Sequence, residues 1–369
     1  EMPAADRFRI GTTTAINGKP YSVAYTGQAQ LISAQGELPK LPPLGQPFGM
    51  VELRSADGEV VSIDYGHTPP NVERGRAVLL EDLQLQGLKD ESAKDEKGRQ
   101  FNCPHCGAPV QVKLAGTKSI TCGSCASIIS LDSGVGGELR SAEQDEPVQP
   151  LIPLGSKGQL QGVHWQVVGF QHRMGVEPGD DEHFGWSEYL LYNQKRGFAF
   201  LVDSEEGWSM VRPTTGAPQL SSNGRTATYM GTKYDLKYTY EAETTYVLGE
   251  FYWQVSRGQK TSNRDFASSK GLLSLEQSAN EITWSSGDKL SSDTVAKAFK
   301  LDDKKDVLQR DDPGPFVAAK GVGCGTIILI AVVILILLII LSDCSGSSGS
   351  GYRSSGGSFG GYSSGGSHK

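Results

Sequence analysis

A run of 22 uncharged residues at positions 321–342, GVGCGTIILIAVVILILLIILS, constrains this chain more than any other feature of its sequence. As an α-helix rising 1.5 Å per residue it would be about 33 Å long, enough to cross a hydrocarbon core of roughly 30 Å. Residues 327–341 contain no polar side chain, so the helix would be apolar on every side, unlike an amphipathic core helix. The sequence therefore predicts one transmembrane helix at 321–342, in contact with a lipid bilayer.

The distribution of basic residues predicts the orientation of this helix. Lys304, Lys305, Arg310 and Lys320 precede the apolar run, whereas only Arg353 lies at a comparable distance beyond it. Because Lys and Arg are enriched on the cytoplasmic side of membrane helices, we expect the large N-terminal part in the cytoplasm and the C-terminal tail outside. The opening residues show no apolar run typical of a signal peptide, in keeping with this single-pass arrangement.

Residues 343–369 form a Gly/Ser-rich tail. Gly and Ser fill 19 of the 25 positions from 345 to 369, and such a segment contains too few apolar side chains to form a core. We therefore expect a disordered tail after the membrane helix and a juxtamembrane linker at 302–320 before it. Cys324 and Cys344 flank the apolar run singly, and we assign them no site.

The other four cysteines form a C-x2-C-x15-C-x2-C pattern: Cys103, Cys106, Cys122 and Cys125. Each CxxC pair can point two sulfurs at one ion, and the spacer can form strands that bring the two turns together. Disulfides are disfavoured in the cytoplasm, and four thiolates in tetrahedral geometry favour zinc, with rubredoxin-like iron as an alternative. Because a four-thiolate site leaves no open position, we predict a structural zinc ribbon at 101–131 and treat His105 as a bystander.

The charge around this ribbon argues against nucleic-acid binding. Residues 101–131 contain Lys113 and Lys118 and no acidic residue, but a zinc–tetrathiolate centre contributes two negative charges that cancel them. The flanking segments at 90–100 and 132–150, interpreted as linkers, are mixed or acidic, and the whole chain has a formal net charge of −7. A zinc-ribbon nucleic-acid-binding function therefore remains only a further alternative.

The chain also repeats itself. Residues 18–39 and 231–252 align without gaps, and seven of the 22 positions are identical, among them Glu37 and Glu250. The opening pattern of both, a glycine followed at fixed spacing by an aromatic and an aliphatic residue, recurs from Gly162. A turn glycine followed by an aromatic and an aliphatic residue two positions apart is typical of a turn that leads into a strand, with both apolar side chains on its inward face. We predict a complete β module at 151–301 and a partial one at 1–89, whose front part we expect to lie upstream.

Apolar and polar residues alternate over much of the second module. The pattern predicts strands at 165–170, 189–192, 197–202, 208–211, 234–240 and 244–253. Only one helix is predicted, at 293–301, where Ser292 or Asp293 can act as the N-cap. The fold class is therefore all-β: tandem small β-sheet or barrel modules with an inserted zinc ribbon, one C-terminal transmembrane helix and a disordered tail.

Two motifs resemble a known family. The segment FGWSEYLLY at 184–192, followed by Gly207 and Trp208, resembles the signature of the bacterial domain-of-unknown-function family 4178. The GELP motif at 36–39, the IDY motif at 63–65 and residues 75–88 resemble the later half of that domain, although the second module has GEFY at 249–252. The resemblance implies a bacterial inner-membrane protein without an established activity. Members of that family tend to be encoded near genes for polyamine synthesis and membrane stress, so the resemblance also implies a connection to envelope stress or a polyamine-linked pathway.

The sequence contains no P-loop, HExxH motif or dinucleotide-binding fingerprint. We therefore expect a non-catalytic, membrane-tethered adaptor or scaffold that docks an unidentified cytoplasmic protein, with a partner-binding groove formed by Trp186, Glu188, Trp208 and Glu250. The alternative is a hydrolase or transferase that uses Glu37 or Glu250, although a carboxylate at such a position more often accepts backbone N–H bonds in a turn. The acidic loop at 177–183 is expected to be solvated.

Overall fold

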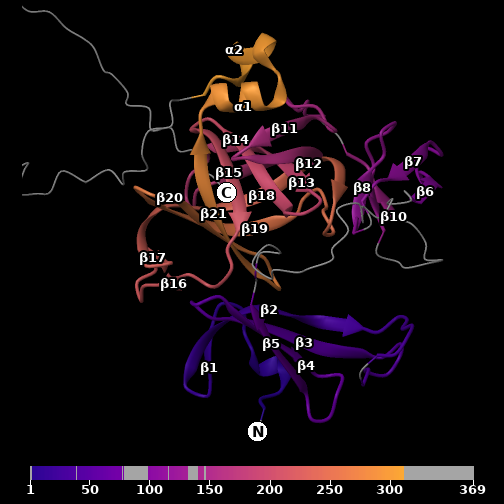
Figure 1. The fold of residues 1–369 in the computed structure, drawn as a ribbon, viewed down its shortest axis with the longest axis vertical. Helices are drawn as coiled ribbons and strands as arrows, with labels where there is room; N and C mark the ends of the chain where they lie inside the picture. The colour runs from indigo at the N-terminus through magenta and orange to yellow at the C-terminus, as the bar shows by residue number, and fades with distance from the viewer. Residues whose placement is uncertain are drawn as a thin grey trace, which may run out of the picture. The chain divides into compact units, whose positions relative to one another are not determined.

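The computed structural model of the chain describes residues 2–38, 40–76, 78, 99–114, 116–131, 140–144 and 147–310. The predicted membrane helix, most of the juxtamembrane linker and the tail lie outside these residues. Within the described ranges, no helix is both long and apolar enough to span a bilayer. Strands dominate, and the prediction of an all-β fold with barrel and small-sheet modules is confirmed for this part of the chain (Figure 1).

Three groups of strands follow one another along the chain. The first is a five-stranded antiparallel sheet with the order β1-β2-β3-β4-β5, and the second is the pair of ribbon hairpins, β6-β7 and β8-β9. The third is a closed barrel in the order β12-β13-β14-β15-β21-β20-β19-β18, with β18 pairing back onto β12. The strand bounds are β1 Thr13–Ile16, β2 Lys19–Gln30, β3 Pro47–Arg54, β4 Glu59–Asp64, β5 Asn71–Arg76, β6 Arg99–Asn102, β7 Pro109–Val112, β8 Ser119–Thr121, β9 Ile128–Ser130, β10 Arg140–Ala142, β11 Lys157–Leu160, β12 Val163–Val176, β13 His183–Asn193, β14 Gly197–Ser204, β15 Gly207–Pro213, β16 Gln219–Leu220, β17 Thr226–Tyr229, β18 Thr232–Phe251, β19 Lys260–Ser268, β20 Gly271–Gln277 and β21 Ile282–Leu290.

The same bulged hairpin occurs three times, as β1-β2, β11-β12 and β17-β18. Each has four paired positions and a two-residue turn in which both residues have positive φ, with a glycine second. Each long strand then contains a β-bulge, where the pairing register shifts between Val23 and Tyr25, between Val167 and Gly169, and between Leu236 and Tyr238. These positions are related by constant offsets of 144 and 213 residues, so the similarity seen in the sequence corresponds to one repeated structural unit.

The repeat extends to a complete five-stranded meander. Strands β1–β5, β11–β15 and β17–β21 each run as a hairpin followed by three further antiparallel strands in the same register. The barrel is therefore made of two meanders, which are joined at two seams: β12 pairs with β18, and β15 pairs with β21. The N-terminal sheet is one such meander.

The strands of the second module differ from the prediction in two respects. The predicted strands at 234–240 and 244–253 are one continuous strand, β18, because the bulged backbone allows a 20-residue strand to bend without breaking. Strands β19, β20 and β21 were not predicted. The barrel-facing positions of β19 include Thr261, Asn263 and Asp265, so this strand lacks the apolar alternation that identifies a strand in a sequence.

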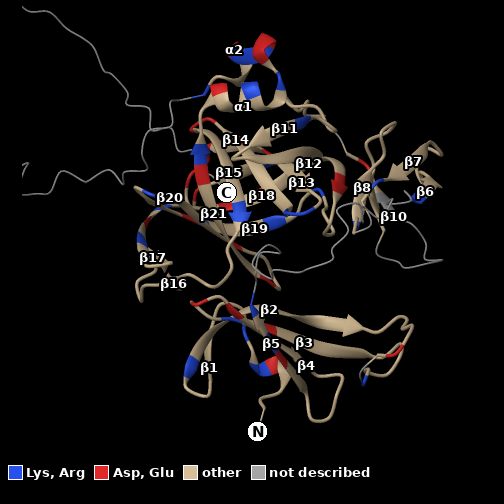
Figure 2. Ribbon diagram, in the orientation of Figure 1, with Lys and Arg blue, Asp and Glu red and all other residues tan. Residues whose placement is uncertain are grey.

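Short helices close the described chain. The N-cap of helix α1 (Ser292–Phe299) is Ser291, whose side chain accepts a hydrogen bond from the Thr294 amide. This cap lies one residue before Ser292, the first of the two predicted caps. It packs against β11 and β15, and its buried Val295, Ala296 and Phe299 join the core of the first barrel meander (Figure 1). The remaining helical turns are η1 (Ala5–Arg7), η3 (Asp302–Lys304) and α2 (Lys305–Leu308). Basic and acidic residues are interspersed on α1 and α2 (Figure 2).

Candidate functional site: a four-cysteine centre and a polar barrel interior

The four ribbon cysteines converge on one point. Both CxxC turns have the same backbone geometry: the amide of Cys103 bonds Ala108 O and that of Cys122 bonds Ser127 O, each at 2.8–2.9 Å. Their Sγ atoms all lie within 4.8 Å of one another. The Cys103–Cys125 and Cys106–Cys122 sulfur separations are 3.8 and 3.7 Å, close to the roughly 3.8 Å edge of a tetrahedron with metal–sulfur bonds of about 2.3 Å. The four cysteines thus form a site that can hold a metal ion.

The four thiols of this centre are in different surroundings. Cys103 and Cys122 are buried, and all four thiols are free of disulfides. Hydrogen bonding with Ser127 lowers the pKa of Cys125 to about 6. The pKa of Cys106 is raised to about 11, because its backbone hydrogen bond with Ala108, which lowers the pKa, is outweighed by contacts with the other thiols and by burial. His105, the expected bystander, is 40 % exposed and lies 3.3 Å from Glu143, so its ring is engaged away from the sulfur cluster.

The two CxxC turns differ at the residue that follows the second cysteine. Gly107 has φ +76°, and the equivalent Ala126 has φ +57°, a left-handed conformation that a Cβ disfavours. Replacing Ala126 by Gly should therefore raise the free energy of unfolding of the metal-loaded ribbon by about 1 kcal/mol. Native-state hydrogen exchange of residues 119–130 measures this change, and Gly107→Ala should lower the same quantity by a similar amount. A destabilised Ala126→Gly variant contradicts the prediction.

Glu250 joins the ribbon to the barrel. Its carboxylate, in a residue 7 % exposed, accepts bonds of 2.8–3.1 Å from the amides of Lys113 and Leu114 and from the hydroxyl of Thr117. Beside it, β18 continues into the ribbon, with Glu250 opposite Ile120 and Phe251 opposite Ser119 in β8. This carboxylate binds backbone amides, as the sequence argument favoured for a repeated glutamate, and its oxygens are used in that contact.

Glu37, the equivalent residue of the N-terminal sheet, is solvent-exposed, and the described residues form no comparable contact with its carboxylate. The two carboxylates of the enzyme alternative are therefore in different environments: Glu250 accepts bonds from the Lys113 and Leu114 amides and the Thr117 hydroxyl, whereas Glu37 faces solvent.

The barrel interior contains a polar cluster around Arg173. Side chains on β12 reach β19 and β20 across the barrel: Arg173 Nη1 lies 2.9 Å from Glu276 Oε2, and Nη2 lies 2.6 Å from Thr261 Oγ1. Glu188 accepts bonds from Gln171 Nε2 at 2.6 Å and from Trp186 Nε1 at 2.7 Å, and it lies 3.8 Å from Arg173. Arg173 and Glu188 are each 2 % exposed, so both charges are almost fully removed from water.

A cavity of about 350 Å³ opens from this cluster. Its lining combines charged and polar groups with aromatic rings, including Gln171, Arg173, Glu188, Phe200, Trp253 and Glu276. Three buried residues of the interior carry polar atoms without a hydrogen-bond partner: Nε of Arg173, the hydroxyl of Ser209 and both amide atoms of Asn263. Unsatisfied buried groups of this kind are costly, and they concentrate here inside one barrel.

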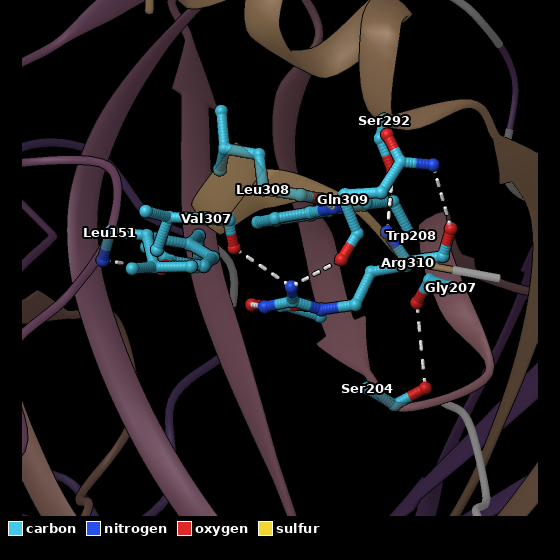
Figure 3. A network of polar contacts seen from close by, with 11 residues as sticks. Leu151, Ser204, Gly207, Trp208, Ser292, Val307, Leu308, Gln309 and Arg310 are labelled. Atoms are coloured by element: carbon cyan, nitrogen blue, oxygen red, sulfur yellow. Dashed lines mark hydrogen bonds and ion pairs between the residues drawn. The ribbon is translucent and has the colours of Figure 1, made fainter. Parts of the chain in front are cut away.

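The four residues of the predicted groove lie in three places. Trp186 and Glu188 meet in the barrel interior, and Glu250 holds the ribbon. Trp208 points away from the barrel interior into the core that contains α1, and its Nε1 donates to Leu308 O at 2.9 Å. The guanidinium of Arg310 lies 5.7 Å from the ring centroid of Trp208 and forms a two-pronged ion pair with Asp203 at 2.7 and 2.9 Å. Its Nη1 also donates to Val307 O at 2.9 Å and to Gln309 O at 2.8 Å (Figure 3). Trp208 thus holds the last described residues of the chain against the barrel.

The acidic loop is exposed at Asp180, Asp181 and Glu182, as expected of a solvated turn. The interior residues that sequence reasoning missed are Gln171, Arg173, Thr261, Asn263 and Glu276. Gln171 and Arg173 lie two positions apart in the strand segment GFQHRMG, so their side chains point to the same face of the strand. Two polar residues on one face were the only sequence signal of this interior cluster.

Residues 153–292 match a family model described as Domain of unknown function (DUF4178). The matched range contains every strand of the closed barrel, from β12 to β21, and ends at Ser292, the first residue of α1. It includes the FGWSEYLLY segment on which the resemblance was based. No curated protein and no solved structure matches the chain.

Proposed function

We propose that this chain is a membrane-tethered, non-catalytic binding protein, in which the barrel takes up a small polar ligand and the ribbon holds a structural zinc ion. The observation that carries the proposal is the closed barrel with a charged interior, a 350 Å³ cavity and buried polar atoms that lack partners. Ligand cavities of about this size typically combine apolar walls with a few polar groups that fix the ligand's orientation.

The charges favour a zwitterion. Arg173 presents an unpartnered N–H, which suits a carboxylate, while Glu188 and Glu276 flank it and suit an ammonium group. Phe200 and Trp253 offer apolar surface beside these charges. A small amino acid or a similar zwitterion satisfies both charge signs, whereas a simple acid or amine satisfies one.

Zinc is the metal that four thiolates at tetrahedral spacing fit best. No protein position remains for a substrate at such a centre, and its role in the proposal is to hold the two ribbon hairpins together. Residues 321–342 are proposed as the tether, with the barrel on the cytoplasmic side.

Thermal-shift and calorimetric titrations of the full chain in detergent test the ligand class. The probes are α-, β- and ω-amino acids, each matched with the carboxylic acid and the amine of the same length. We expect stabilisation by at least one zwitterion series and a loss of binding of at least about tenfold in Arg173→Gln. Lys195→Gln, in the exposed turn between β13 and β14, is the matched control and should bind normally. Failure of every zwitterion to bind the unaltered chain overturns the proposal.

A further inference from the structure

The N-terminal sheet has the architecture of half a barrel. Its strands correspond one to one to β11–β15, with an offset of 144 residues in β1–β2 and 138 in β3–β5. They correspond likewise to β17–β21, with an offset of 213 residues in β1–β3 and 212 in β4–β5. In the barrel, two such meanders close through two seams. In the N-terminal sheet, β5 is an edge strand. Residues 28–30 of β2 have no strand partner on the side of β1 among the described residues, whereas the preceding Tyr25 forms a bridge to Glu281. These two edges are the counterparts of the two barrel seams.

At each seam of the barrel, the two meanders pair through equivalent positions of the repeat, as they would about a two-fold axis. At the β15–β21 seam, Arg212 pairs with Ser286, and both correspond to Arg74. At the β12–β18 seam, Met174 pairs with Glu243, and both correspond to Gln30. Pairs on either side of these centres are also symmetric; Val211–Gly287, for example, corresponds to Glu73–Gly75. One meander sequence can therefore supply both sides of both seams, as a two-fold symmetric pair requires.

The surface that such closure would cover is incompletely buried. Phe48, Met50 and Val60 are half-buried, whereas their barrel counterparts include the fully buried Trp186 and Glu188. Ile32, which continues the β2 edge, is 69 % exposed. Every residue of β5 except Val72 is exposed, and an uncovered edge strand is a template for pairing with another strand.

We propose that the N-terminal half-barrel closes with the same half-barrel of a second copy of this chain. Strand β5 pairs with its own copy around Arg74, and β2 pairs with its own copy around Gln30. The two Arg74 side chains meet at one two-fold axis, and each lies 4.0 Å from Glu59 of its own sheet, which offsets their mutual repulsion. This inference uses different residues from the ligand proposal and does not depend on it.

Disulfide trapping of the full chain in lipid nanodiscs tests the pairing. Directly opposed residues in antiparallel strands have Cα atoms about 4.5–5.5 Å apart, within disulfide reach. Arg74→Cys should therefore cross-link to its own copy under mild oxidation. In the matched control, Glu73→Cys, the two cysteines are diagonal neighbours about 7–8 Å apart. Cys324 and Cys344 are replaced by Ser in both variants to remove background cross-links.

We expect Arg74→Cys to form covalent dimers at least about tenfold faster than Glu73→Cys, because the strand register sets the local thiol concentration. Gln30→Cys should behave like Arg74→Cys at the other seam. Mass photometry of the unaltered chain should show two chains per particle. Equal cross-linking rates at positions 73 and 74, or particles with a single chain, overturn the proposal, whatever the barrel binds.

Discussion

Removing the metal should unfold the ribbon and leave the barrel folded. The ribbon core consists of a few side chains around Cys103 and Cys122, chiefly Val110, Val112, Ile120 and Ile129. So small a core cannot offset the conformational entropy of its residues without the metal, whose binding contributes on the order of 10–16 kcal/mol in comparable zinc sites. The barrel has its own cores on both faces of its strands.

Two measurements check this expectation. Metal analysis of the full chain should find about one zinc per chain, and Cys103→Ser combined with Cys122→Ser should abolish it. Limited trypsin digestion should then cleave after Lys113 and Lys118 while the barrel resists. The matched control replaces Cys324 and Cys344, which lie outside the ribbon, and should retain the metal. Trypsin resistance of the ribbon in the metal-free chain contradicts a structural role for the metal.

Glu250→Ala should undock the ribbon from the barrel without emptying its metal site. The substitution leaves two partly buried amides and the buried Thr117 hydroxyl without their acceptor, a cost on the order of 3 kcal/mol. Amides of β8 should exchange about 100-fold faster with solvent, since each 1.4 kcal/mol corresponds to a factor of ten. Hydrogen exchange resolved by mass spectrometry measures this rate.

The internal repeat supplies the control for this experiment. Glu37 aligns with Glu250, but it is exposed and makes no comparable contact among the described residues. Glu37→Ala should therefore change stability by less than about 0.5 kcal/mol and leave β8 exchange unaltered. Similar effects of the two substitutions would show that the carboxylate of Glu250 does not hold the ribbon. Retention of zinc in Glu250→Ala would separate docking from metal binding.

The metal site was predictable because its chemistry depends on local spacing. Two residues between cysteines place both sulfurs on one turn, so Cys103, Cys106, Cys122 and Cys125 could be assigned without the fold. The repeated glycines were predictable for the same reason, since a positive φ at Gly18, Gly162 and Gly231 is a local requirement.

The barrel interior was not predictable, because it depends on strands far apart in the chain. Arg173 meets Thr261 and Glu276 only after β18 pairs with β12 and closes the barrel, 88 and 103 residues away in sequence. Polar residues on the inward face also make β19 hard to recognise as a strand in the sequence, because it shows no alternation of apolar and polar residues.

By itself, the sequence determined the all-β class, the four cysteines that can hold a metal ion, and the repeated turn glycine with the strand that follows it. Only the tertiary structure decided that two repeats close into one barrel while the third remains a single five-stranded sheet. The tertiary structure also placed Trp186 and Glu188 in the barrel interior, Trp208 against Leu308 and Glu250 against the ribbon. The physical reason is that hydrogen-bonded turns and metal ligands are fixed by neighbours in the chain, whereas strand closure and the burial of charges are fixed by residues that only folding brings together.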